Sequence, residues 1–471
     1  MQSPVRLSRQ HAGVAAWIGI ARVDITPPVG IYARNWGAAL HDVAESIHRP
    51  LQLTVMTLVQ QLDGEPLVLI DADLGWWKTP QVFASVQRRL LEAADLEPAQ
   101  LIFALTHTHA GPPLMEPDES LPGADKIGPW MEQVVASAIG AIREARQQAV
   151  AAVLEWHVGR CGLAAYRDLD DPAAPGRRLI CGYNPAGQPD DTLLLGRVTT
   201  RDGRLLATLV NYACHPTTLA WDNRAISPDF IGAMRETMQR QTGVPALFLQ
   251  GASGELGPRY QYVGNTSVAD QHGQQLAFAA LATLEDMQPP AERLVYTGTV
   301  ESGAPLAVWQ HQPRDLPRQL RAHTGVVSLP LKDWPTAAEL EQQRAATGDR
   351  ALEERLRRKR DIRRALGDGA EYDLSIWVWR LGEAVLIGTC CEAYSCWQQE
   401  LRRRFPDLTV ICMNLINGSI GYLPPQSLYA QDLYQVWQTP FDRGSLERLT
   451  EVSAELIALS LTADPRRLEP V

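Results

Sequence analysis

The chain contains the segment Leu101-Ile-Phe-Ala-Leu-Thr-His-Thr-His-Ala-Gly-Pro112, in which five apolar residues run directly into a Thr-His-Thr-His motif. A short apolar run that stops at polar residues and a Gly-Pro pair is typical of a buried strand ending at a loop. Side chains alternate along a strand, so this reading places His107 and His109 on one face. The segment predicts a strand over 101–109 with two imidazoles at its carboxyl end.

Four further apolar runs stop in the same way. They lead into Cys-His215-Pro, Gly251-Ala-Ser-Gly-Glu-Leu-Gly-Pro258, Cys-Cys-Glu392 and Asn417-Gly-Ser-Ile-Gly-Tyr422. Ligand sites in open α/β sheets lie just outside the carboxyl ends of strands. We therefore expect the five loops to form one rim carrying histidine, glutamate and tyrosine side chains. Zinc takes such nitrogen and oxygen donors and can keep one position for water.

The rest of the chain alternates short β-rich runs with longer helical patterns. Strands are predicted at 51–59, 66–74, 193–199, 205–213, 245–251, 375–389 and 408–416. Helices are predicted at 80–96, 129–149, 229–241, 337–366 and 445–461, and a long loop at 160–192. This alternation predicts an α/β fold with mixed β-sheets flanked by helices.

Length and composition limit the possible functions. With 471 residues and 45% hydrophobic residues the chain can bury a large core, and a net charge of −10 argues against a nucleic-acid partner. A length prior allows about three domains, but motifs between 107 and 434 that meet at one site predict a single large domain over 1–471. No membrane span and no convincing signal peptide are evident, and seven cysteines without a CxxC pair indicate free thiols. A cytoplasmic location follows as an expectation.

Each local signal has a plainer structural interpretation. His215 before a proline is compatible with a hydrogen-bonded structural residue, Glu392 with a buried ion pair, and Tyr422 with an ordinary loop tyrosine. The His-x-His motif also lacks the downstream Asp-His of the metallo-β-lactamase pattern, because Ala110 and Gly111 stand there. The charged helix at 337–366 is interpreted as a solvated face rather than a basic patch.

Taken together, the motifs resemble the catalytic domain of the neutral (alkaline, non-lysosomal) ceramidase superfamily. The resemblance covers about 15–435. The matching segments are Ile18–Pro27, Thr106–Pro112, Asn211–Pro216, Ser227–Gly232, the glutamate Glu392, the pair Gly421-Tyr422 and the tyrosine Tyr434.

Carried over residue by residue, the resemblance implies one zinc ion per chain, held by His107, His215, Glu392 and Tyr422. His109 is then expected beside the metal without binding it. Arg167 and Tyr434 are implied as further active-site residues. Arg167 matches an arginine that the family carries after asparagine, and Tyr166 takes the place of that asparagine here.

The implied activity is hydrolysis of an amide (N-acyl) bond by zinc-bound water. His109 is expected to relay a proton to the departing amine, and Tyr434 to stabilise the oxyanion together with zinc. Arg167 is expected to hold a polar or anionic part of the substrate, with a loop salt bridge as the alternative.

Three departures from the family bear on the substrate. Gly257 occupies the place of a serine thought to act in catalysis. Ser253 is not proposed to replace that serine. The chain ends 37 residues after Tyr434, so the family's C-terminal β-domain is expected to be missing, and no secretion signal is seen. We therefore expect a small-molecule acyl-amide substrate that is smaller or more polar than ceramide.

Other functions stay open at this stage. One alternative is a relative that binds a small ligand with little or no turnover, and another is a zinc esterase or lactonase. Phosphoester hydrolysis needs a second metal, for which only Asp71, Asp73 and Asp229 are available; these read more easily as structural acids. Trp36, Trp76, Trp77 and Trp221 are candidates for lining an apolar pocket, or for core packing.

Overall fold

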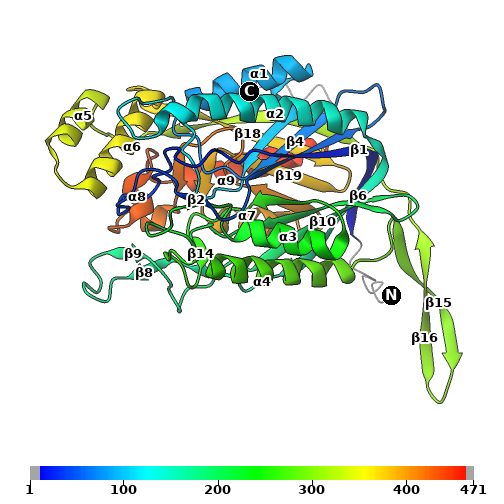
Figure 1. Ribbon diagram of the computed structural model, residues 1–471. Helices are drawn as coiled ribbons and strands as arrows, with labels where there is room; N and C mark the ends of the chain where they lie inside the picture. The colour runs from blue at the N-terminus through cyan, green and yellow to red at the C-terminus, as the bar shows by residue number, and fades with distance from the viewer. Residues whose placement is uncertain (1–10, 463–471) are drawn as a thin grey trace.

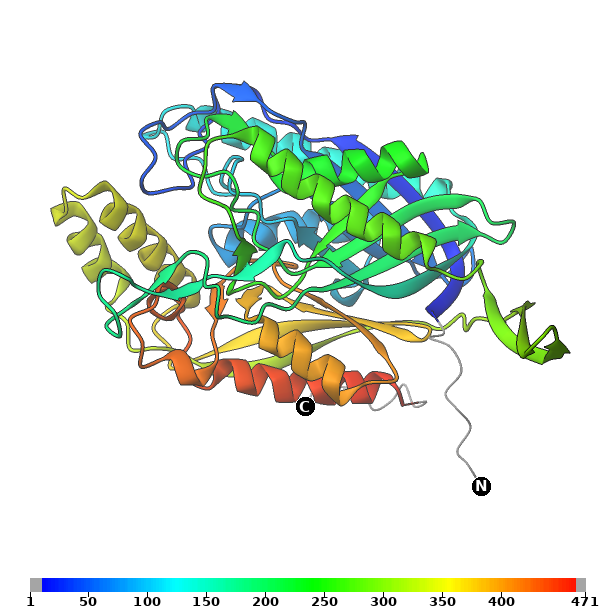
Figure 2. The same ribbon diagram turned by 90° about the horizontal axis from the view of Figure 1, so that it is seen from below.

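The fold was analysed in a computed structural model that describes residues 11–462. It has four layers, with two β-sheets packed face to face and helices on both outer faces (Figure 1). Turning the molecule shows the smaller sheet and its two covering helices as a separate layer beneath the larger sheet (Figure 2).

The larger sheet has eight strands and mixes parallel with antiparallel pairs. In spatial order these are β13 (Ala246–Gln250), β11 (Leu205–Tyr212), β10 (Thr192–Thr200), β6 (Val150–Arg160), β1 (Ala12–Asp24), β3 (Gln52–Val59), β4 (Leu67–Ala72) and β5 (Leu101–Leu105). Only the two edge pairs, β11–β13 and β4–β5, are parallel. The sheet curls until its edges meet, since the Phe248 amide of β13 donates to Asp71 of β4 at 2.9 Å.

The smaller sheet packs on the inner face of the larger one. Its order is β17 (Leu320–Pro330), β18 (Glu371–Leu381), β19 (Ala384–Thr389) and β21 (Thr409–Met413). Alternate residues of the two sheets share one apolar core that includes Leu69, Ile102 and Leu209 from the larger sheet and Trp379 and Ile411 from the smaller. The only parallel pair of this sheet, β19–β21, again lies at an edge.

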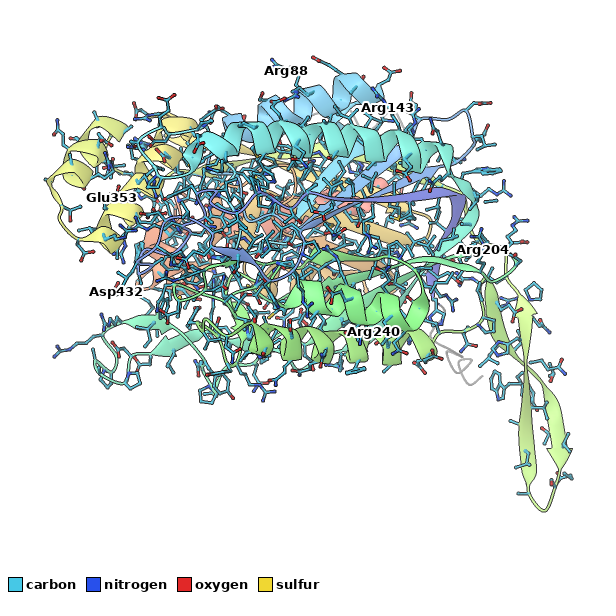
Figure 3. All side chains as sticks on the ribbon, viewed as in Figure 1. Arg88, Arg143, Arg204, Arg240, Glu353 and Asp432 are labelled. Atoms are coloured by element: carbon cyan, nitrogen blue, oxygen red, sulfur yellow. The ribbon has the colours of Figure 1, made fainter. Side chains whose placement is uncertain are left out.

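Helices cover the outer faces of both sheets. The larger sheet is covered by α1 (Pro80–Ala94), α2 (Ile127–Gln147), α3 (Phe230–Thr242) and α4 (Thr266–Glu285), and the smaller by α7 (Ser395–Arg404) and α9 (Ser445–Ser460). Charged side chains on their outer faces, such as Arg88, Arg143 and Arg240, point into solvent (Figure 3).

Several smaller elements lie outside these layers. They are the pairs β2 (Ser46–Ile47) with β12 (Ala225–Ile226), β7 (Ala164–Tyr166) with β14 (Leu256–Pro258), β8 (Asp168–Asp170) with β9 (Leu179–Cys181), and β20 (Cys391–Ala393) with β22 (Gly421–Leu423). Short helical turns are η1 (Pro98–Gln100), η2 (Ala124–Lys126), η3 (Gln426–Leu428) and α8 (Tyr434–Gln438). The helices α5 (Ala337–Ala346) and α6 (Arg350–Leu366) form a pair at one end, and β15 (Glu292–Glu301) and β16 (Pro305–Pro313) form a hairpin that projects from the other (Figure 1).

The predicted α/β fold with mixed sheets flanked by helices is confirmed. All the helices predicted above are present, the charged segment 337–366 as the pair α5 and α6. That residues 1–471 form a single domain stays a prediction. Within residues 11–462, no helix combines the length and the apolar character that crossing a membrane requires. All seven cysteines are free thiols, as expected.

Two local predictions are wrong. The strand predicted over 101–109 stops at Leu105, and His107 has a φ of 71°, in the left-handed region that strands do not use. The strand alternation therefore does not govern His107 and His109. The loop predicted at 160–192 contains three short strands, β7, β8 and β9.

Candidate functional site

The site forms where the three parallel strand pairs end. His107 follows β5, His215 follows β11, and Glu392 and Tyr422 lie on β20 and β22, which continue from β19 and β21. Parallel neighbours present their carboxyl ends at one edge, so residues far apart in sequence meet there. Glu392 and Tyr422 are direct register partners. All four side chains of the implied zinc site are thus brought together, and each is at most 8% exposed.

The two imidazoles are oriented by backbone carbonyl groups. His215 Nδ1 donates to the Ser253 carbonyl at 2.7 Å, and His107 Nδ1 to the Gly75 carbonyl at 3.3 Å. A carbonyl oxygen only accepts hydrogen bonds, so each Nδ1 carries a proton, and each ring in its neutral form has its lone pair on Nε2. The left-handed backbone at His107 turns its ring into the site. Strained backbone of this kind collects at functional sites.

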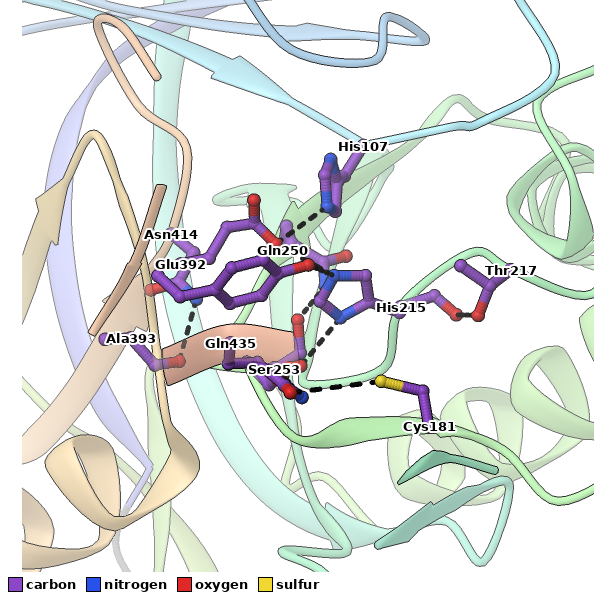
Figure 4. A network of polar contacts seen from close by, with 12 residues as sticks. His107, Cys181, His215, Thr217, Gln250, Ser253, Glu392, Ala393, Asn414 and Gln435 are labelled. Atoms are coloured by element: carbon purple, nitrogen blue, oxygen red, sulfur yellow. Dashed lines mark hydrogen bonds and ion pairs between the residues drawn. The ribbon is translucent and has the colours of Figure 1, made fainter. Parts of the chain in front are cut away.

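Both free Nε2 atoms face the same carboxylate oxygen. Glu392 Oε2 lies 2.9 Å from His215 Nε2 and 3.2 Å from His107 Nε2 (Figure 4). Burial acts to raise the pKa of Glu392, but the two imidazoles hold it well below its usual range. Burial and the Arg167 guanidinium lower the pKa of His215 to about 3. The carboxylate is therefore charged and His215 neutral at neutral pH.

This donor set fits a metal ion. Two Nε2 atoms and a carboxylate oxygen face one another closely enough for a single cation to bind all three, and Tyr422 Oη adds a fourth donor atom, 3.4 Å from His215 Nε2. Nδ1 atoms held by carbonyl oxygens are also the usual outer shell of metal-binding histidines. Two nitrogens and two oxygens match the preferences of zinc.

His109 belongs to the same cluster. Ligand atoms of His107, His109 and His215 all lie within 4.8 Å of one another, so the three histidines together could also hold a metal ion. The His109 ring lies against Trp76 and Trp36, with ring centroids 4.7 Å and 5.1 Å away. Its Nε2 has no hydrogen-bond partner, and burial lowers its pKa well below the usual range. His109 is therefore a neutral imidazole with a free nitrogen at the site.

Arg167 is buried beside Tyr422. Its Nη2 donates to the Gly254 carbonyl at 2.7 Å and to Tyr422 Oη at 3.3 Å. Among the described residues no carboxylate forms an ion pair with it, so the loop salt bridge considered from sequence is not seen. Burial raises the pKa of Tyr422 well above the usual range, and Arg167 opposes that shift. The guanidinium therefore favours negative charge on the Tyr422 oxygen.

Tyr434 stands at the start of α8, with its ring 5.6 Å from that of Tyr422. Burial raises its pKa, although Arg358 acts against this. Tyr434 thus keeps its phenolic proton at neutral pH and can donate a hydrogen bond.

A side chain at the place of the family serine would require Gln261 to shift. A Cβ atom at Gly257 would lie 2.9 Å from Gln261 Oε1, which itself accepts from Thr217 Oγ1 at 2.6 Å. Ser253, four residues earlier, is 1% exposed, and its Oγ accepts from Gln250 Nε2 at 2.6 Å. Its contribution to the site is the carbonyl group that orients His215.

The three other carboxylates have structural partners. Arg235 contacts Asp71 and Asp73, each at 2.5 Å. Asp229 caps α3 and accepts from the Leu219 amide at 2.8 Å. Each already has a cation or backbone amides as partners, which agrees with the structural role expected from the sequence.

Two cavities of about 350 Å³ and 400 Å³ open beside the cluster. Both are lined by His109, Tyr422 and Tyr434. Of the tryptophans singled out from sequence, Trp36 and Trp76 lie against His109, whereas Trp77 is 1% exposed and packs on Phe83 and Phe103.

Sequence reasoning missed Lys78, Arg358 and Tyr262, which also line the cavities. Of these three residues, only Lys78 could have been found from the sequence. It follows β4, the parallel neighbour of β5, and the histidines follow β5.

No model of a protein family and no curated protein sequence matches the chain. Two solved structures are similar in fold. Neutral ceramidase from Pseudomonas aeruginosa superposes with a TM-score of 0.68 at 16% identity, covering 97% of this chain and 75% of that one. A ceramidase complexed with C2 gives a TM-score of 0.67 at 15% identity, covering 95% and 75%. The chain therefore has the fold of neutral ceramidase, and the resemblance drawn from its motifs is confirmed at the level of the fold.

Proposed function

We propose that the chain is a zinc-dependent hydrolase that cleaves an amide (N-acyl) bond with water. The observation that carries this proposal is the pair of Nε2 lone pairs directed at the Glu392 carboxylate, at 2.9 Å and 3.2 Å, beside a cavity. In this proposal His107, His215, Glu392 and Tyr422 hold the metal. When bound, zinc makes a water molecule more acidic and polarises a carbonyl group.

His109 is proposed to move the proton. Its free Nε2 lies among the imidazoles, and its neutral state lets it accept a proton from the attacking water. The same nitrogen then returns the proton to the departing amine, which leaves as a neutral molecule. Trp36 and Trp76 fix the plane of the ring.

Tyr434 and Arg167 are proposed to bind the charged and polar groups of the reacting substrate. Tyr434 keeps its proton and lines both cavities, so it can donate to the oxyanion that forms when water adds to the carbonyl. Arg167 positions Tyr422 through its Nη2. It also lines the 400 Å³ cavity, so its guanidinium can hold a polar part of the substrate.

The first experiment measures metal content. Elemental mass spectrometry of wild type is expected to give about one zinc per chain, and His215→Ala is expected to lose it. His311→Ala is the matched control, because His311 lies on the projecting hairpin and is exposed. Wild type that takes up no metal, even after incubation with zinc, would refute the proposal. Two metals per chain would redirect the search to phosphoesters.

The second experiment separates a hydrolase from a binding protein. A panel of N-acyl amides, with esters and lactones alongside, is offered to wild type, His109→Ala and Tyr434→Phe. A hydrolase predicts that both variants keep the metal and lose 10²-fold or more in kcat. A relative that only binds its ligand has no turnover to lose on any member of the panel. Faster cleavage of the esters than of matched amides would favour the esterase alternative.

A further inference from the structure

One wall of the 350 Å³ cavity is cationic. It is formed by Lys78, from the segment after β4, and by Arg357 and Arg358 of α6, with Glu354 between the arginines. These four residues are called the cationic cluster below. Glu392 and Tyr422 line the same cavity. The charged segment 337–366 is therefore not only the solvated helix face expected from sequence.

Lys78 has no counter-ion. Its Nζ lies 4.2 Å from the Trp76 ring and donates one long hydrogen bond, 3.4 Å, to Asn35 Oδ1. In the part of the chain that the structure describes, no carboxylate comes within ion-pair distance of it. Burial lowers its pKa well below the usual range and Arg358 adds to the effect, while the Glu354 carboxylate acts against it. An ammonium group here is costly until an anion reaches it.

The two arginines share a single carboxylate. Glu354 Oε1 accepts from Arg358 Nε at 2.7 Å, and Glu354 Oε2 contacts Arg357 Nη2. Glu354 is 4% exposed, so this interaction is well shielded from water. Three cations against one carboxylate leave the cationic cluster with a formal charge of about +2 when Lys78 is protonated.

The other carboxylates of the cavity are occupied or exposed. Glu392 belongs to the metal cluster, Asp361 is paired with Arg360 at 2.6 Å, and Glu116 and Asp118 are exposed. Exposed charges are screened by solvent and act weakly on a buried group. The excess positive charge of the cationic cluster therefore remains.

The cationic cluster lies close to the reacting groups. Trp76 contacts both, since its ring is 4.2 Å from Lys78 Nζ and 4.7 Å from the His109 ring. These two distances place Lys78 Nζ no more than about 9 Å from the His109 ring. An anion bound at Lys78 is thus only a few bonds from an amide placed at the metal cluster.

The second cavity is richer in aromatic side chains. Its 400 Å³ are lined by Trp36, Trp221, Tyr262 and Trp437, and also by Arg167, Arg355 and Arg358. Because both cavities reach His109, Tyr422 and Tyr434, an amide at the cluster can extend one half into each. Of these two cavities, Lys78 and Arg357 line only the first, and Trp221, Tyr262 and Trp437 line only the second.

We propose, resting on the hydrolase function above, that the substrate is an N-acyl amide with a compact anion, a carboxylate, in one half and an apolar chain in the other. Lys78 and Arg358 bind the carboxylate, and the aromatic cavity takes the apolar chain. Lys78 is the residue that determines this specificity, because no carboxylate among residues 11–462 pairs with it.

Two substrate pairs test the proposal and locate the anion. N-octanoylglycine and N-octanoylglycinamide differ only in a charge on the amine side, and N-octylsuccinamate and N-octylsuccinamide only in a charge on the acyl side. In at least one pair, wild type is expected to prefer the carboxylate by about 30-fold or more in kcat/KM. Lys78→Met is expected to reduce that preference below threefold, mainly through KM, and Lys78→Arg to restore part of it.

Lys359→Met is the matched control. Lys359 also lies over a tryptophan ring, 4.4 Å from that of Trp334, and is on α6, but it does not line the cavity. It is expected to leave the preference unchanged. A wild type that cleaves both members of each pair equally, or a preference that survives Lys78→Met, would overturn the proposal.

Calorimetry separates this inference from the proposed hydrolysis. 4-Oxoundecanoic acid, the ketomethylene analogue of octanoylglycine, and its primary amide are titrated into wild type and Lys78→Met. One outcome is that none of the four substrates is cleaved, yet wild type binds the acid at least 10-fold tighter than the amide and Lys78→Met does not. This outcome would support the anion site and refute the hydrolase function. Absence of both cleavage and binding preference would reject both.

Discussion

At the scale of single residues, Ser253 shows how a side chain and its own backbone can have separate roles. The Ser253 carbonyl orients His215, and the Ser253 hydroxyl contacts only Gln250. Ser253→Ala is therefore expected to keep kcat within about threefold and to lower the free energy of unfolding by about 1 kcal/mol through the lost hydrogen bond. Enzyme assays and urea unfolding check the two parts. A loss of 10³-fold in kcat with the metal retained would instead make the hydroxyl a catalytic group.

Whether the place of a single residue could be predicted depends on the interactions that determine its position. His107, His215, Glu392 and Tyr422 were found because each follows an apolar run, and buried strands must end where polar side chains begin. The left-handed backbone conformation of His107 was not predicted. Its φ of 71° is imposed by hydrogen bonds to the neighbouring loop, such as that from its amide to the Leu74 carbonyl at 2.9 Å. Glu354 was missed because local sequence does not tell which face of a charged segment is buried.

At the scale of elements, Glu255 joins the loop after β13 to the start of α7. Its carboxyl group accepts from the Ser395 amide at 2.9 Å, where the dipole of the helix favours negative charge. Burial outweighs these hydrogen bonds and raises the pKa of Glu255 from 4.5 to about 8. The folded protein therefore keeps a proton on this group over a range in which the unfolded chain has lost it.

This predicts a loss of stability as the pH rises. Below pH 4.5 both states are protonated, and between pH 4.5 and about 8 only the folded state is. Over that window the free energy of unfolding falls with pH, by at most about 1.4 kcal/mol per unit from this group. Glu255→Gln is expected to flatten the profile, as measured by urea unfolding with a chelator present in every sample. Parallel profiles for the two proteins would contradict the assignment.

Elements differed in how readily the sequence revealed them. Most strands of the two sheets have apolar faces on both sides, because each sheet is covered twice, and their apolar runs could be recognised, although β6 and β17 were not predicted. The hairpin β15–β16 has most of its residues exposed and so carries no apolar face to detect. Its strands are joined by main-chain hydrogen bonds and by exposed cross-strand contacts such as the ring pair of Tyr296 and Trp309.

At the scale of the whole molecule, the candidate metal cluster joins the two sheets. His107 and His215 come from the larger sheet, and Glu392 and Tyr422 from strands that extend the smaller one. An ion held by all four stabilises the folded state by mass action, about 2.7 kcal/mol at a free concentration 100 times its Kd. Chelation is therefore expected to lower the Tm of wild type by several degrees and to leave His215→Ala unchanged. Calorimetric scans that respond equally in the two proteins would argue against a metal that links the sheets.

The projecting hairpin lies at the opposite end of the molecule from α8, whose Tyr434 lines both cavities (Figure 1). Its base is narrow, closed by the hydrogen bond from the Arg314 amide to the Ala291 carbonyl at 2.7 Å, and a Cβ atom at Gly303 in its tip would meet no other atoms. Exposed tips of this kind tolerate foreign sequence. An affinity tag or a second protein inserted at Gly303 would leave the cavities open. The hairpin is therefore a suitable point for attaching this chain to a solid support.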